Sequence, residues 1–273
     1  MKLSLVSMAI FIFVVMLGVK DSQQMLRGLM DPRGPPKGPP RGPPRGPPKG
    51  PLRGPLGGPP TKPANRTCSI TKMSYRMVFP ERRVENYVLI RNAIKQELRA
   101  VTLCSFVKDN ASDSSYEKQC PYSYAVPGQH NEFSFCTSPT LQVLINGTTR
   151  KTSVSIEDGK WHHICFTWES STGRYRFFKH GKTVVMGSDF QKGYKIRAGG
   201  TLVLGQDQDK LAGDFDVEEA FVGELSQLNV WDSVLPRMVI VKQRKKCHIT
   251  KGTINWWEQF KDFVFGGVKV IEK

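Results

Sequence analysis

A four-residue repeat limits what the first part of the chain can fold into. From Arg33 onward, a Lys or Arg is followed by Gly-Pro and then by Pro or Leu, six times in succession. Proline fixes φ and lacks the amide hydrogen that helix and sheet interiors require. Collagen is also excluded, because its triple helix needs Gly at every third position and here Gly recurs at every fourth. We therefore expect an extended polyproline II arm over residues 23–66, with a packed core only after it.

The arm carries half of the chain's net charge of +16, because residues 23–66 contain nine Lys or Arg and one Asp. A step of four residues along a threefold helix turns each cation to a new face, so no basic stripe forms. One function of the arm would be a weak attraction to anionic surfaces. The alternative is a soluble spacer that its own repulsion keeps extended. Specific nucleic-acid recognition is not predicted.

The N-terminal residues 1–22 are typical of a secretory signal peptide. Lys2 is followed by an apolar run over residues 3–19, which is shorter than the roughly 20 residues of a membrane span. A membrane anchor is the alternative to cleavage and secretion. Secretion predicts glycosylation at three Asn-x-Ser/Thr sites, namely Asn65, Asn110 and Asn146.

Residues 67–273 have the pattern of one all-β domain. Short apolar stretches alternate with polar residues over 100–107, 132–136, 163–168, 175–179 and 201–205. Turn-forming pairs such as Asn146-Gly147 and His180-Gly181 lie between them. Short strands with frequent turns predict a two-sheet antiparallel sandwich. One short helix is expected over residues 236–246.

The chain has six cysteines, which in a secreted protein favours three disulfides over a metal site. Cys120 and Cys136 are equidistant from Gly128, which follows Pro127. In a hairpin turning at Gly128, the two cysteines would lie directly opposite each other and could form a disulfide. Six cysteines allow 15 pairings, so this remains a hypothesis at the level of sequence.

Residues 207–219 form an acidic cluster in a basic chain, with six of the 24 acidic residues in 13 positions. Carboxylates so close together repel one another unless water or a cation intervenes. Calcium, which takes several oxygen ligands, is the expected cation. An EF-hand is excluded, because Leu211 and Ala212 occupy its fifth ligand position and its invariant glycine. A solvated acidic loop without an ion is the alternative.

Three motifs in order resemble the pentraxin family. Residues 161–170 read Trp-His-His-Ile-Cys-Phe-Thr-Trp-Glu-Ser, which matches the family signature His-x-Cys-x-Ser/Thr-Trp-x-Ser/Thr. Residues 204–209 and 220–232 resemble the family's calcium loop and the strands that follow it. The resemblance covers about residues 70–260 and does not include the arm.

The resemblance implies a jelly roll of the concanavalin and laminin-G type, assembled into a ring such as a cyclic pentamer. Up to two calcium ions would lie on one face of each protomer. The ligands bound through them would be phospho-monoesters, phospholipid headgroups or carbohydrates. The acidic pair bridging both ions corresponds to Asp207 and Asp209, with the Gln208 carbonyl beside them, and the other ligands correspond to Asn131, Asp216 and Glu219.

The sequence departs from the family pattern near the first ion. His130 stands where the family has Asp beside Asn131, and a neutral imidazole is a poor calcium ligand, so we expect this ion to bind more weakly. Cys136 and Leu144 replace residues of the family's phosphocholine pocket, so phosphocholine is not predicted. The family disulfide corresponds to Cys104–Cys165. Cys68 and Cys247 then remain as the third pair.

These features predict a secreted, calcium-dependent recognition protein of innate defence. The alternatives are an extracellular-matrix module of the laminin-G type and a carrier for a cationic peptide released from the arm. An enzyme is not predicted, because the chain has no Gly-x-Ser-x-Gly elbow, His-Glu-x-x-His run or phosphate-binding loop.

Overall fold

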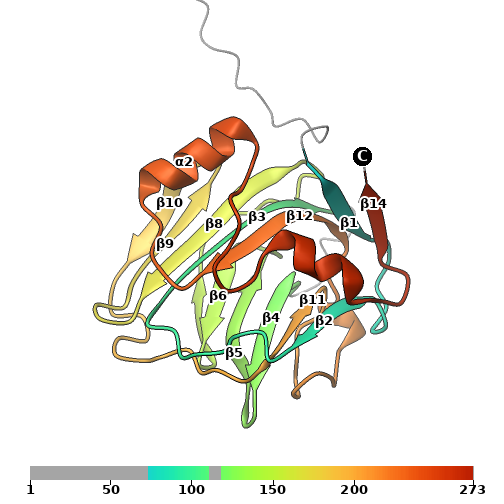
Figure 1. The fold of residues 1–273 in the computed structure, drawn as a ribbon, viewed down its shortest axis with the longest axis horizontal. Coiled ribbons are helices and arrows are strands. Elements are labelled where there is room, and N and C mark those ends of the chain that lie inside the picture. Colours follow the sequence, from blue (N-terminus) through green and yellow to red (C-terminus); the bar gives the residue numbers. More distant parts are fainter. Residues whose placement is uncertain (1–72, 111–117, 273) are drawn as a thin grey trace, which may run out of the picture. The chain divides into compact units, whose positions relative to one another are not determined.

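The computed structural model describes residues 73–110 and 118–272, which form two antiparallel sheets of seven strands each (Figure 1). Sheet A has the order β10-β9-β8-β3-β12-β1-β14, and sheet B has the order β13-β2-β11-β4-β5-β6-β7. The predicted all-β sandwich is confirmed. The signal peptide, the arm, Asn65 and Cys68 lie outside the described residues.

The strands of sheet A are β1 Tyr75–Phe79, β3 Ala100–Asp109, β8 His162–Glu169, β9 Arg174–Lys179, β10 Lys182–Gly187, β12 Gly223–Trp231 and β14 Lys269–Glu272. Those of sheet B are β2 Tyr87–Arg91, β4 Tyr122–Val126, β5 Gln129–Cys136, β6 Gln142–Ile145, β7 Thr148–Lys151, β11 Thr201–Leu204 and β13 Val264–Phe265. The helical segments are η3 Val217–Glu219, α2 Arg237–Lys246 and η4 Trp257–Asp262. The helix expected over residues 236–246 is thus α2.

Side-chain alternation places two apolar layers on sheet A. Phe166 and Phe177 point inward and join the main core between the sheets, where Trp168 is fully buried. Their neighbours Cys165 and Phe178 point outward, where they pack with Ile240 of α2 in a second, smaller core. The helix therefore covers the outer face of sheet A (Figure 1). Among the described residues, no helix is long and apolar enough to cross a membrane.

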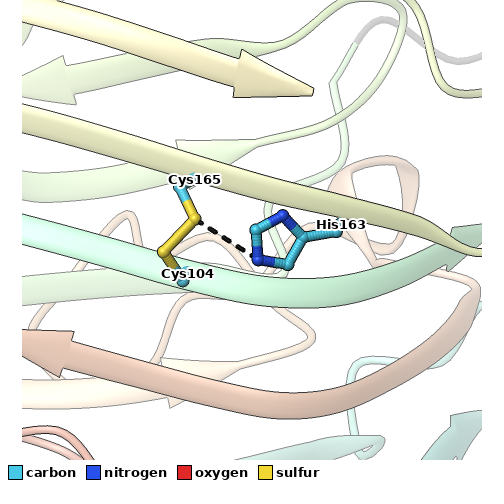
Figure 2. A group of neighbouring side chains, drawn as sticks. All are labelled: Cys104, His163 and Cys165. Carbon is cyan, nitrogen blue, oxygen red and sulfur yellow. Dashed lines mark hydrogen bonds between the residues drawn. A yellow bond between two sulfur atoms is a disulfide. The ribbon is translucent and has the colours of Figure 1, made fainter. Parts of the chain in front are cut away.

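A disulfide joins Cys104 on β3 to Cys165 on β8, where the two residues are direct partners across the strands. Figure 2 shows the ring of His163 beside this bond, with its Nε2 3.7 Å from the Cys165 sulfur. A disulfide sulfur has no proton to give, so Nε2 is the donor. Because both cysteines are bonded to each other, this trio does not form a metal site.

The second disulfide joins Cys120 to Cys136, but the predicted strand register was wrong by one position. Tyr122 lies opposite Phe135, so Cys136 is level with residue 121 rather than with Cys120. The hairpin does turn at Pro127-Gly128, and Gly128 has φ +76°. Between the pairs Val126–Gln129 and Tyr124–Phe133, β5 advances four residues while β4 advances two, and this irregularity moves every pair beyond it.

Cys247 at the end of α2 is also disulfide-bonded, and its partner lies outside the described residues. Two of the predicted glycosylation sites are described. Asn110 is exposed at the end of β3, and Asn146 begins the turn between β6 and β7. Glycosylation at both remains a prediction.

Acid should destabilise the fold through His163. Burial lowers its pKa to about 3, and the charges of Arg244 and His180 act in the same direction. The unfolded chain takes up this proton near pH 6.5, so stability is lost as pH falls from there toward 3. Between pH 7 and pH 5, we expect the wild type to lose about 2 kcal/mol more than a His163→Leu variant. Urea unfolding at the two pH values measures this difference.

Two controls make the comparison specific. Burial raises the pKa of Asp109 to about 6, so its contribution to stability is lost as pH rises, and it affects both proteins equally. A His248→Gln change at an exposed histidine should leave the pH dependence unaltered. Parallel pH profiles for the wild type and His163→Leu would contradict the prediction.

Candidate metal centre

Three acidic side chains of the cluster meet beside sheet B. Asp207 and Asp209 follow β11, and Glu219 is the last residue of η3. One carboxylate oxygen from each lies within 4.8 Å of the others. The side chain of Asp207 is fully buried, whereas Asp209 is exposed. Three of the four carboxylates assigned by resemblance therefore face one small volume.

The ammonium of Lys118 lies among these carboxylates. It bonds to Oδ2 of Asp207 and lies 3.5 Å from Oε1 of Glu219. Burial alone would lower the pKa of Lys118, but the attraction of Asp207 and their hydrogen bond outweigh it, so the pKa is raised. Burial raises the pKa of Glu219, and Lys118 opposes that shift. Sequence reasoning missed Lys118, because 89 residues separate it from Asp207.

The side chain of Gln208 holds the acidic loop against sheet B. Its amide nitrogen donates to the carbonyl oxygens of Ser123, at 2.9 Å, and Thr201, at 3.1 Å. Its amide oxygen accepts from the backbone of Ala212 at 2.9 Å. The buried amide is thus committed to the protein. A metal ligand at Gln208 would have to be the main-chain carbonyl, as the resemblance implies.

Asp216 and Asn131 are not bonded to the three converging carboxylates. Asp216 caps η3, because its Oδ1 accepts from the backbone of Glu218 at 2.9 Å. Asn131 lies near the start of β5, and its buried Oδ1 has no hydrogen-bond partner among the described residues. An unpartnered buried oxygen is costly unless a ligand satisfies it. His130, beside it, is exposed.

The buried carboxylate of Glu132 fixes the position of Asn131. It accepts from the Arg197 guanidinium, with Nη2 at 2.7 Å, and from the Arg197 backbone, also at 2.7 Å. The Tyr194 hydroxyl donates to it at 2.8 Å. The start of β5 is thereby tied to the loop that precedes β11.

A groove of about 450 Å³ adjoins the carboxylates. Lys118 and Glu219 line one part of it, and Thr149 and Lys151 of β7 line another. Leu144 also lines the groove and packs on the Cys120–Cys136 disulfide, away from the main core. The groove therefore offers two ammonium groups and hydroxyls beside a cluster of oxygen donors.

The donor set fits a hard divalent cation such as calcium. Asp207, Asp209 and Glu219 supply charged oxygens, and Asn131 has an amide oxygen without a partner. A calcium ion here would offset the repulsion between the carboxylates and could accept oxygen ligands from a molecule in the groove. A two-sheet sandwich with such a loop and groove defines a binding domain, and no catalytic constellation accompanies it in the described residues.

The chain belongs to the pentaxin family, whose model matches residues 76–270. Neuronal pentraxin-2 of Mus musculus is 39% identical over 173 residues, which cover 63% of this chain and 40% of that protein. Neuronal pentraxin-1 of Rattus norvegicus is 35% identical over 196 residues, covering 71% and 44%. The chain thus spans about two fifths of the length of these relatives. The crystal structure of a heptameric SAP-like pentraxin from Limulus polyphemus superimposes with a TM-score of 0.61 at 27% identity, covering 74% of this chain and 96% of that one.

Removing the Glu132 carboxylate should destabilise the domain. A Glu132→Ala variant leaves the backbone amide of Arg197 and the Tyr194 hydroxyl without their acceptor, at a cost of about 2 kcal/mol. Glu97→Ala is a matched control, because Glu97 pairs with Lys195 of the same loop but is exposed, and its loss should change stability much less. Equal unfolding midpoints for the two variants in urea would contradict this prediction.

Proposed function

We propose that this chain is a secreted, calcium-dependent binding protein of innate defence. The convergence of Asp207, Asp209 and Glu219 is the observation that supports the proposal. The Gln208 carbonyl, Asn131 and Asp216 would complete up to two calcium sites. The ion held through Asn131 would be the weaker one, because His130 supplies no carboxylate there.

The groove beside the carboxylates favours ligands with negatively charged or hydroxyl oxygens. Calcium would coordinate such oxygens, and Lys151, which also lines the groove, would add a positive charge. Phospho-monoesters, phospholipid headgroups and carbohydrates meet this description. A glycan and phospholipid array, read with calcium and with EDTA, tests the proposal. Binding that is equal under both conditions would overturn it.

A ring of identical subunits is the proposed assembly. The Limulus relative is heptameric, and a cyclic pentamer is our expectation for this chain. Native mass spectrometry of the secreted protein would give the number of subunits. It would also show whether the arm over residues 23–66 stays attached, which separates this function from that of a peptide carrier.

Calcium should stabilise the fold through the acidic cluster. At 100 times its dissociation constant, one bound ion adds about 2.7 kcal/mol. An Asp207→Asn variant should lose this gain, because it removes the buried carboxylate. Glu218→Gln should keep it, because Glu218 lies in the same loop outside the converging trio. Thermal melts with EDTA and with millimolar calcium measure the effect, and superimposable wild-type curves would refute calcium binding.

Lys118 should compete with calcium for the same carboxylates. A Lys118→Gln variant removes an ammonium that calcium must otherwise displace, so calcium affinity should rise about tenfold or more. Without calcium, the same variant should be less stable than the wild type, because the carboxylates lose their counter-charge. Lys151→Gln, which removes a charge from the groove but none from the trio, is the matched control. Calorimetric titration measures the calcium affinity of each variant. A calcium affinity of Lys118→Gln at or below that of Lys151→Gln would contradict competition between Lys118 and calcium.

A further inference from the structure

The exposed side of α2 is mostly basic. No Asp or Glu occurs between Asp232 and Glu258, a stretch that holds six Lys or Arg. Four of these side chains on α2 are exposed and have no ion-pair partner in the described parts of the chain, namely Arg237, Lys242, Lys245 and Lys246. We refer to these four residues as the α2 basic surface.

Helix stability alone does not account for this pattern. Cations in the last turn, such as Lys245 and Lys246, do complement the helix dipole. Arg237, however, is the first residue of α2, where a positive charge is unfavourable and no acidic residue offsets it. Lys242 and Lys246 are four residues apart, a spacing at which like charges repel. The charges at Arg237 and Lys242 therefore oppose the stability of the helix that carries them.

The α2 basic surface is held in a fixed position on sheet A. Nε of Arg244 donates to Nδ1 of His180 at 3.3 Å, and Nε2 of His180 lies 3.0 Å from Nδ1 of His162. Nε2 of His162 in turn lies 2.7 Å from the Asp158 carboxylate. With both rings neutral, every donor in this chain meets an acceptor. Burial lowers the pKa of His180 to about 4, which keeps the chain in this form at neutral pH.

The turn between β9 and β10 extends the basic surface. A side-chain carbon at Gly181 would come within 3.3 Å of Val241, so this turn lies directly against α2. The exposed Lys182 follows the turn at the start of β10. Lys182 thus adds an exposed cation next to the turn that contacts the helix, on the edge strand of sheet A.

We propose that the α2 basic surface and Lys182 bind a sulfated polysaccharide, and that this binding does not require calcium. A linear polyanion can contact cations arranged along a helix and release its counterions as it does so. A membrane fits less well, because the apolar side of α2 is already buried against sheet A and Met238 is its one exposed large apolar residue. Nucleic acid also fits less well, since residues 236–246 contain no aromatic side chain on which a base could stack.

Heparin is the probe for a direct test in EDTA with the full chain. One variant replaces Arg237, Lys242, Lys245 and Lys246 with Gln. The control variant replaces four exposed lysines elsewhere, Lys95, Lys160, Lys192 and Lys269, with Gln and therefore has the same net charge. Any contribution of the arm is common to both. We expect the α2 variant to elute from heparin at lower salt than the control, with the slope of log Kd against log salt reduced by about 3 to 4.

Three results would overturn the proposal. The first is equal elution of the α2 variant and its control. The second is wild-type affinity for single-stranded DNA at least equal to its affinity for heparin. The third is that the α2 variant, compared with its control, loses more affinity for phosphatidylserine vesicles than for heparin. Both variants should fold, because the buried contacts of Ile240 and Gln243 are unchanged. A Lys242→Gln, Lys245→Gln double variant, which keeps Arg237, provides a second comparison if the fourfold variant does not fold.

Discussion

The buried carboxylate of Asp207 requires a neighbouring positive charge, and the arrangement of the side chains around the acidic loop depends on that requirement. A lone ionised carboxylate in a buried position is strongly destabilising, so a partner must be present. Lys118 supplies one partner, and a hard cation would supply another. Both would use the same oxygens of Asp207 and Glu219, so binding of one cation would displace the other. The buried amide of Gln208 keeps the loop in place in either case.

Much of the fold could be predicted, because alternation along short strands determines which side chains enter the core. The stretches expected around Cys104 and Cys165 are the central strands β3 and β8. The pairs Asn146-Gly147 and His180-Gly181 form the turns β6–β7 and β9–β10, and all four residues have positive φ. The short helix expected over residues 236–246 corresponds to α2. The three carboxylates that meet were all within the acidic cluster noted in the sequence.

What the sequence did not reveal depends on pairing between distant residues or on small irregularities. The irregularity between Tyr124 and Val126 shifts the β4–β5 register, because β5 carries two extra residues there, and no residue type in either strand indicates it in advance. Lys118 approaches Asp207 only because β4 and β11 are neighbours in sheet B. The hydrogen-bonded row from Asp158 to Arg244 likewise joins a loop, two strand ends and a helix. Asp216 also caps η3 through its Oδ1, a role that its residue type alone does not indicate.

The alternation of side chains also separates the two surfaces that carry opposite charge. Leu144 and the Cys120–Cys136 disulfide lie outside sheet B, beside the acidic loop, whereas Cys165 and Phe178 lie outside sheet A, beneath α2. A ligand in the groove beside the carboxylates and a polyanion on α2 would therefore occupy opposite sides of the sandwich and would not exclude each other. In a ring with one rotation axis, every copy would present the same side in the same direction. Such a disc would act as an adaptor, with each of its two sides gaining avidity from the number of copies.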